Sequence, residues 1–236
     1  ASREDHTEVM KLLLEVGASV DEKDEFGNTL LLQASQRGHT EVVQLLLDKG
    51  APINENAGRN GTALMRASEY GRTEVVGLLL WNVASVKEKD KDGKTALMLA
   101  SLKGQTEVVQ QLLDKGASVN EKDNNGDTVL MWAIKEGHIE VVQLLLGKGA
   151  SVKEKDGNGD TVLMWAIKEG HMEVVQMLLD KGASLDEKNT DGKTVLMQAF
   201  IAPAGVASAM WAREKGHTEV VKLLLDNGAP INDEKE

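Results

Sequence analysis

Two apolar phrases alternate along the chain. The first begins at a threonine and reads TLLLQA at Thr29, TALMRA at Thr62 and TVLMWA at Thr128. The second follows shortly afterwards and reads HTEVVQLLLDKGA from His39, with valines and leucines that form an apolar stripe at helical spacing. Glu41, near its start, suits the positive end of a helix dipole. The pattern predicts a pair of short helices joined by a tight turn.

The pair recurs at a fixed interval. The threonine that opens the first phrase returns every 33 residues, as Thr29, Thr62, Thr95, Thr128, Thr161 and Thr194. A fixed period of this size is typical of a stacked repeat array, in which each unit buries its apolar face against its neighbours. Since such arrays usually present binding surfaces, the pattern favours binding over catalysis.

Polar, turn-forming stretches separate the helix pairs. Residues 119–126, VNEKDNNG, have the content of a hairpin that projects between units. Glycines follow the second helix, where a left-handed residue is wanted, at Gly50, Gly116, Gly149, Gly182 and Gly228. Val83 takes that position in one unit, and a β-branched residue with positive φ costs about 1–3 kcal/mol. We therefore expect the turn to change, with Asn82 in the left-handed position. Trp81 beside it makes an apolar tip, either a packing variant or a secondary contact patch.

The repeat resembles the ankyrin repeat, whose unit runs roughly D-x-x-G-x-T-P-L-H-x-A-A-x-x-G-H-x-x-V-V-x-L-L-L-x-x-G-A-D-V-N. Residues 123–150, DNNGDTVLMWAIKEGHIEVVQLLLGKGA, follow this pattern, and the resemblance covers nearly the whole chain. It implies an all-α solenoid, an ankyrin-repeat array of stacked helix-turn-helix units with projecting β-hairpin loops.

The expected organisation is a single domain over residues 1–236. The ranges are a half repeat at 1–23, full repeats at 24–56, 57–89, 90–122, 123–155 and 156–188, and a last repeat at 189–236. Because ASREDH at the start aligns with residues 34–39, the sequence is interpreted as beginning inside a first helix, as a fragment of a larger protein.

The chain also departs from the family pattern at its histidine position and in its last repeat. Where the family has histidine, this chain has Leu32, Met65, Met98, Met131, Met164 and Met197. We interpret this column as core packing by adaptable thioethers. The last repeat carries 13 extra residues near 200–212, because Thr194 to His217 spans 23 positions where other repeats span 10. Pro203 and Gly205 predict a bent loop or an extra helical turn there. This insertion either packs on its own unit or forms a lip that contacts a ligand or another copy.

Composition narrows the classes of function. The chain has no cysteine, which excludes disulfides, thiolate metal sites and cysteine nucleophiles. No apolar run approaches the roughly 18 residues of a membrane span, and no signal peptide opens the sequence. The formal net charge of −11 disfavours nucleic acid and anionic lipid, and favours neutral or basic partners.

The resemblance also implies where a partner binds. Ankyrin-repeat partners most often contact the hairpin tips and the exposed side of the first helices, along the concave side. Carried over by position, the partner-binding set is Phe26, Arg59, Arg66, Tyr70, Leu99, Asp127, Trp132, Glu136, Asp160, Trp165, Glu169 and Trp211.

Two neighbouring repeats carry the same chemistry. Residues 125–138 are identical to residues 158–171, so Trp132 and Trp165 should form a row about 8–10 Å apart, with Trp211 as a third member. The row is either an anchor for a peptide or packing between units. Some ankyrin domains read methylated lysine with tryptophan and acidic residues, and that alternative stays open.

Catalytic, cofactor and metal sites are not indicated. The five histidines occupy one repeat position, whole units apart, and do not converge as metal ligands. The GKT triplets at 93–95 and 192–194 lack the glycine that a phosphate loop needs five residues earlier. Residues 156–167 mimic a calcium loop but have Thr161 in place of its glycine and Ile167 in place of its terminal glutamate.

The sequence therefore predicts a non-catalytic, monomeric protein-interaction module in the cytoplasm or nucleus. A concave groove centred on the two tryptophans, with Asp127 and Asp160 at the tips adding acidity, would bind an extended basic or apolar peptide. The alternative is a structural spacer or self-assembling module of a larger scaffold.

Overall fold

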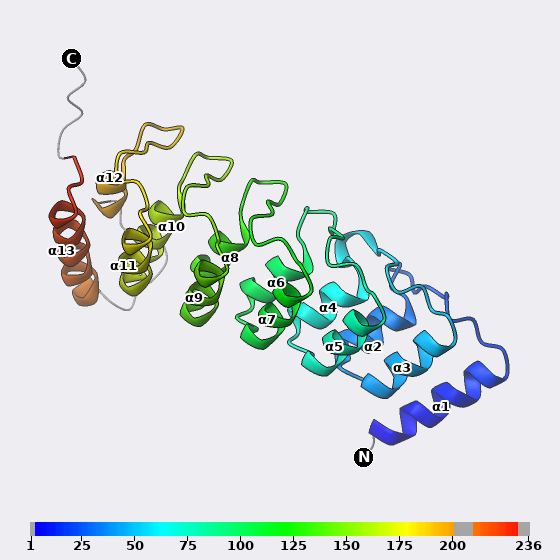
Figure 1. The fold of residues 1–236 in the computed structure, drawn as a ribbon. Coiled ribbons are helices and arrows are strands. Elements are labelled where there is room, and N and C mark those ends of the chain that lie inside the picture. The colour runs from blue at the N-terminus through cyan, green and yellow to red at the C-terminus, as the bar shows by residue number, and fades with distance from the viewer. Residues whose placement is uncertain (1–2, 201–209, 231–236) are drawn as a thin grey trace. The chain divides into compact units, whose positions relative to one another are not determined.

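The computed structural model describes residues 3–200 and 210–230, which form an all-α repeat solenoid (Figure 1). The helices belong to two compact units, residues 1–124 and 125–236. The first unit contains α1 (Arg3–Glu15), α2 (Leu30–Arg37), α3 (Thr40–Asp48), the short 3₁₀ helix η1 (Gly58–Asn60), α4 (Ala63–Glu69), α5 (Thr73–Trp81), α6 (Ala96–Leu102) and α7 (Thr106–Asp114). The second contains α8 (Val129–Lys135), α9 (Ile139–Gly147), α10 (Val162–Glu169), α11 (Met172–Asp180), α12 (Val195–Phe200) and α13 (Met210–Asp226).

Every first helix of a pair begins at the recurring threonine. Thr29 has extended backbone angles, and its Oγ1 accepts a hydrogen bond of 3.2 Å from the backbone amide of Leu32. The threonines of the later repeats accept the same bond from the residue three positions on. A threonine at this position satisfies one of the amides that a helix start leaves without an intrahelical partner. The residue that recurs every 33 positions is therefore the N-cap of the first helix in each repeat.

The methionine column packs inside the array. Met65, Met98, Met131 and Met164 are fully buried, which confirms the prediction of core packing for these four. In three repeats the methionine sulfur also lies 3.4 Å from the backbone amide of the capping threonine. Sulfur is a weak acceptor, so the contact completes the cap without a strong hydrogen bond. Met197 differs, because its side chain is exposed.

Helices stack in two rows within each unit. In the first unit α2 packs against α4 and α4 against α6, while α3 packs against α5 and α5 against α7. In the second unit α10 packs between α8 and α12, and α9 contacts α11. The second helices supply the leucine that recurs at Leu46, Leu79, Leu112, Leu145 and Leu178, each 0% exposed. Burial of these aliphatic side chains, with few aromatics, holds the repeats together.

Hairpins connect the repeats and are tied to one another. Residues Asp24, Asp90 and Asp156 each accept two backbone amide bonds of 2.8–2.9 Å from their own hairpin, through Oδ1. Backbone amides also reach the preceding hairpin, as from Lys91 to Gly58 in the first unit and from Gly157 to Asn125 in the second. No helix among the described residues is long and apolar enough to cross a membrane.

The turn at Val83 keeps the geometry of the glycine turns. Val83 has a φ of 60°, whereas Asn82 has a φ of −84°, so the expectation that Asn82 would take the left-handed position is wrong. The amide of Val83 donates to Leu80 O and that of Ala84 to Leu79 O, the same pair of bonds that Gly50 and its successor make. These bonds and the burial of Ala84 fix the path of the backbone. Val83 therefore adopts a positive φ that is strained for a β-branched residue.

The last repeat departs from the helix-turn-helix pattern. Most of the insertion near 200–212 lies outside the described residues, and so does the bent loop or extra helical turn predicted there. After it, α13 runs without interruption through Gly216 and His217, where the other repeats turn. His217, which occupies the same repeat position as His39, therefore lies inside a longer helix and not at the start of one.

Candidate functional site

Side chains at the variable first-helix position point back to the hairpins. Gln33 Nε2 donates to Asp24 Oδ2 at 2.9 Å, and Trp165 Nε1 donates to Asp156 Oδ2 at 3.1 Å. Gln198 Nε2 lies 3.4 Å from Asp160 Oδ1. Trp165, which was expected to face a partner, thus also braces the hairpin of its own repeat, and Gln33 does the same in the first described hairpin.

Arg66 is held in the same way. Its Nε donates to the Asn60 carbonyl at 2.8 Å, and its Nη2 donates to Asn60 Oδ1 at 2.9 Å. Its Nη1 is paired with Glu69, and both side chains are largely covered. A guanidinium with this many fixed bonds is preorganised and largely covered.

The two tryptophans differ in exposure. Trp132 is 8% exposed and belongs to the core, whereas Trp165 is half-buried. Lys135 Nζ lies 4.9 Å from the ring centroid of Trp132, and Lys168 Nζ lies 5.4 Å from that of Trp165. Each indole therefore has a cation from its own repeat over one face. The side chain of Trp211 lies outside the described residues.

Two predicted contact residues are inside the protein. Leu99 is buried on α6 beside Ala96 and Ala100, which are also buried. Asp160 is 8% exposed, and its Oδ1 accepts a 2.7 Å bond from Asn189 Nδ2. The expectation that its carboxylate adds acidity at an open hairpin tip is therefore wrong. The next hairpin covers it and uses it as a hydrogen-bond acceptor.

The remaining acidic candidates lie nearer to solvent. Glu136, just after α8, is exposed, while Asp127 and Glu169 are half-buried. Among residues 3–200 and 210–230, no three or more histidine, aspartate or glutamate side chains are grouped so that they could hold a metal ion.

Exposed candidates of the first unit centre on two neighbouring hairpins. Phe26, at the first tip, is 71% exposed, and Arg59 in η1 at the second is also exposed. A hydrogen bond of 2.6 Å from Asn60 Nδ2 to Asn28 Oδ1 joins the two hairpins beneath these side chains. Tyr70, at the end of α4, is exposed as well.

Asp24 holds the first tip rigidly. Its Oδ1 accepts the backbone amides of Phe26 and Asn28, and its Oδ2 accepts the side-chain amides of Asn28 and Gln33, all at 2.9 Å. The bonds from Asn28, side chain first and then backbone, lower the pKa of the Asp24 carboxyl. Sequence reasoning missed Asp24 as a framework residue, although an aspartate recurs five residues before most capping threonines and signals this role.

Comparison with known proteins agrees with this architecture. A family model described as ankyrin repeats, in three copies, matches the chain over residues 1–90, 64–156 and 149–235. A search of curated proteins found no match. Since the family model spans nearly all of the sequence, the chain belongs to the ankyrin-repeat family.

Proposed function

We propose that the protein is a non-catalytic interaction module whose main contact surface in the first unit is the tip pair, formed by Phe26 and Arg59. Ankyrin repeats are in general protein-interaction modules. The observation that carries the proposal is the combination of exposure and rigidity at Phe26, whose side chain projects from a hairpin fixed by four hydrogen bonds to Asp24. An exposed aromatic on a fixed hairpin backbone binds with little further loss of backbone conformational entropy.

The charge around the tip pair indicates the kind of partner. Asp21, Glu22 and Glu25 are exposed on the same hairpin as Phe26, and the chain has a formal net charge of −11. Acidic side chains around an aromatic suit a partner segment that carries lysine or arginine beside an apolar residue. In the second unit, exposed Glu136 and half-buried Glu169 and Trp165 support the same preference.

A capture experiment with a matched control tests the proposal. The intact chain, Phe26→Ala and Trp81→Ala would each be immobilised and incubated with cell lysate, and a captured protein would then be titrated in purified form. Both side chains are exposed aromatics, but Trp81 is the last residue of α5 and belongs to neither Phe26's nor Arg59's hairpin tip. We expect Phe26→Ala to weaken binding by at least about tenfold, as for an interface hot spot, and Trp81→Ala to leave it unchanged.

The salt dependence separates the charge argument from the aromatic one. Because the partner is expected to be basic, its affinity should fall as salt rises. Arg59 carries the same sign of charge as such a partner, so substitution of Arg59 should not weaken this salt dependence.

In the capture experiment, loss of binding in Trp81→Ala with retention in Phe26→Ala would move the contact surface to the end of α5 and reject the tip pair.

A further inference from the structure

The end of α5 differs from the ends of the second helices on either side of it. We call Gly77, Trp81 and Val83 the α5 patch. The flanking repeats have glutamine, aspartate and glycine at these positions, as Gln44, Asp48, Gly50 and Gln110, Asp114, Gly116. In those repeats the glutamine side chain donates to the aspartate, at 2.6 Å in α3 and 2.7 Å in α7. In α5 a glycine and an indole replace this polar pair and make the surface apolar.

Packing within the protein does not account for the α5 patch. Glycine inside a helix is unfavourable relative to other residues, yet there is room for a side chain at Gly77. The one described atom beyond its own helix that an added Cβ would approach is Gln111 Oε1, at an ordinary contact distance of 3.8 Å. Val83 is strained at a φ of 60° and is 84% exposed. Residues that break local rules without helping the fold are typical of functional sites.

The indole of Trp81 is open to solvent. Trp81 is 81% exposed, whereas Trp132 is 8% exposed. On a helix, a long side chain lies over the residue four positions earlier, which for Trp81 is Gly77. The glutamine that other repeats have there would cover part of the ring. Glycine leaves that side of the indole uncovered.

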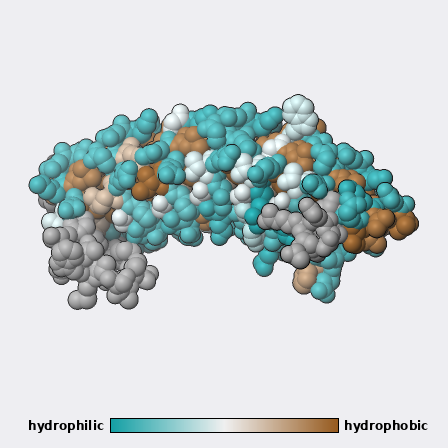
Figure 2. Space-filling model, turned by 90° about the horizontal axis from the view of Figure 1, so that it is seen from below, coloured by the Kyte–Doolittle hydropathy of each residue, from teal (hydrophilic) through white to brown (hydrophobic). Residues whose placement is uncertain are grey.

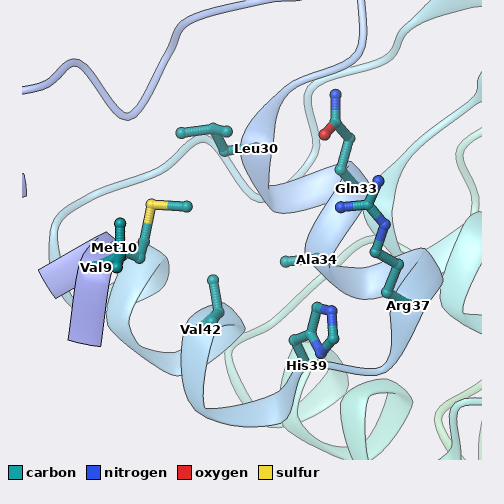
Figure 3. Close-up of a pocket in the computed structure, with 8 residues that line it drawn as sticks. All are labelled: Val9, Met10, Leu30, Gln33, Ala34, Arg37, His39 and Val42. Carbon is teal, nitrogen blue, oxygen red and sulfur yellow. The ribbon is translucent and has the colours of Figure 1, made fainter. Parts of the chain in front are cut away.

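The exposed apolar residues of α1 are of another kind. Val9 and Met10 line a cavity of about 320 Å³ with Leu30 of α2 (Figure 3), and Figure 2 shows apolar side chains gathered at the right-hand end of the view, the end that carries α1 in Figure 1. The equivalent of Val9 one repeat later, Val42, is buried, so the stacking of repeats explains such side chains. The equivalents of Trp81 in the flanking repeats are exposed aspartates. Stacking therefore gives no reason for an indole at that position.

The helices around the α5 patch are acidic. Helices α3, α5 and α7 pack in sequence and contain neither lysine nor arginine. Their exposed carboxylates are Glu41, Asp48, Glu74, Glu107 and Asp114. Lys49 and Lys115 follow α3 and α7, whereas Asn82 takes this position after α5. The indole thus lies on an acidic helix face, in the repeat that lacks this lysine.

An exposed indole on an acidic face suits a cation. The face of the ring attracts lysine and arginine, arginine also stacks on it, and nearby carboxylates add Coulombic attraction. Nucleic acid and acidic segments would be repelled, and a second copy of this chain would bring its own formal net charge of −11.

We propose that the α5 patch binds a basic segment of a partner protein, which places an arginine or lysine side chain on the Trp81 indole. The patch shares no residue with the tip pair. It is a second contact surface, whose partner does not depend on Phe26.

Two matched peptides test this proposal. The probes are ARLARLARLA and AELAELAELA, which differ only in the residue that carries the charge and hence in its sign. The chain has four tryptophans, and the indole N–H signal of Trp81 in the NMR spectrum of the full chain is assigned by its absence from Trp81→Ala. We expect the arginine peptide to shift this signal to saturation and the glutamate peptide to leave it in place.

The same signal measures the contribution of the uncovered ring. Gly77→Gln restores the side chain of the other repeats, and we expect it to weaken binding of the arginine peptide by about threefold, the size of an exposed cation–π contact. Glutamine also favours the helix, so the Tm should rise while binding weakens. A role of Gly77 in stability alone would not produce this combination.

Two equivalent aspartates measure the contribution of charge. Asp114 and Asp180 hold the same repeat position, and each accepts a 2.7 Å bond from the glutamine four residues earlier. Asp114→Asn, on the helix next to α5, should weaken binding at Trp81 by about twofold to fivefold, and Asp180→Asn, two repeats further on, should leave it unchanged. Phe26→Ala should also leave it unchanged, which keeps this test independent of the proposed function.

Three results would overturn the proposal. The first is a Trp81 signal that stays in place throughout the arginine titration, and the second is an equal shift with both peptides. The third is a concentration-dependent dimer, measured by sedimentation, that Trp81→Ala abolishes and Phe26→Ala retains. In that case a second copy of this chain, and not a basic partner, occupies the α5 patch.

Discussion

At the scale of single residues, Val83 shows how a repeat overrides local preference. The turn after each second helix from α3 to α13 closes with two backbone bonds and buries the alanine that follows, and five of these six turns place glycine there. Val83 keeps the bonds and accepts a φ of 60°, with its side chain 84% exposed. Exposure means that the valine gains little from packing in return for the strain.

Replacing this valine should stabilise the protein. Val83→Gly removes the strain of a β-branched residue at positive φ, and we expect the free energy of unfolding to rise by about 0.5–1.5 kcal/mol, part of the relief being offset by the entropy of glycine. Urea unfolding would measure it. The reverse change, Gly116→Val, is the matched control, since an added Cβ there meets no atom within 4 Å and only strain is introduced. A loss of stability in Val83→Gly would contradict this account.

The sequence predicted the structural role of the residues that recur in every repeat, but not the exposure of those that vary between repeats. Thr29 and its equivalents, the buried methionines and the cap glycines follow from periodicity, because each has the same neighbours in every repeat. Exposure of the candidate site does not follow from periodicity. Asp160 faces inward because Asn189 of the next hairpin donates to it, and Trp132 is covered by its surroundings. The burial of Asp160 depends on a contact between repeats, which a position within one repeat does not reveal.

At the scale of elements, hydrogen bonds within each hairpin fix the backbone that carries the exposed side chains. Aspartate at its base fixes the turn by accepting backbone amides, and the first helix adds a side chain that reaches the same carboxylate or its neighbours. In the last described hairpin Asn189 replaces the aspartate, and its Oδ1 still accepts the amides of Asp191 and Lys193. The turn therefore needs an acceptor at this position, while the charge adds the further bonds to Oδ2.

The Asp24 hairpin should make stability depend on pH. Hydrogen bonds from Asn28 lower the pKa of Asp24 in the folded protein below the unfolded value of about 3.9. A depressed carboxyl pKa stabilises the fold above the unfolded pKa, and this contribution is lost as the pH falls through the folded pKa. Asp24→Asn should therefore be less stable than the intact chain at pH 6, and the difference should shrink below about pH 4.

Urea unfolding of both proteins between pH 6 and pH 2 measures this difference. The other carboxyl groups are common to both chains, so their contributions cancel when the two curves are subtracted. A difference that stays constant over the whole range would show that the Asp24 carboxylate gives the folded state no pH-dependent stability.

At the scale of the whole molecule, stability should be local. The chain forms two compact units, residues 1–124 and 125–236, and each repeat is held by its sequence neighbours. In such an array the free energy is roughly a sum of repeat terms and nearest-neighbour interface terms. A defect in one unit should then reduce protection mainly in that unit.

Two equivalent leucines allow this to be measured. Leu46→Ala in the first unit and Leu145→Ala in the second each remove a side chain that is 0% exposed, and each should cost about 2–5 kcal/mol. By hydrogen exchange, Leu46→Ala should raise exchange mainly within residues 3–124, and Leu145→Ala mainly within residues 125–200. Leu13→Ala, at the same repeat position in α1, should cost below about 1 kcal/mol, because Leu13 is 48% exposed and little packing is lost. Equal loss of protection in both units for either core variant would instead mean that the two units unfold as one, and that the interface terms between repeats exceed the stability of either unit alone.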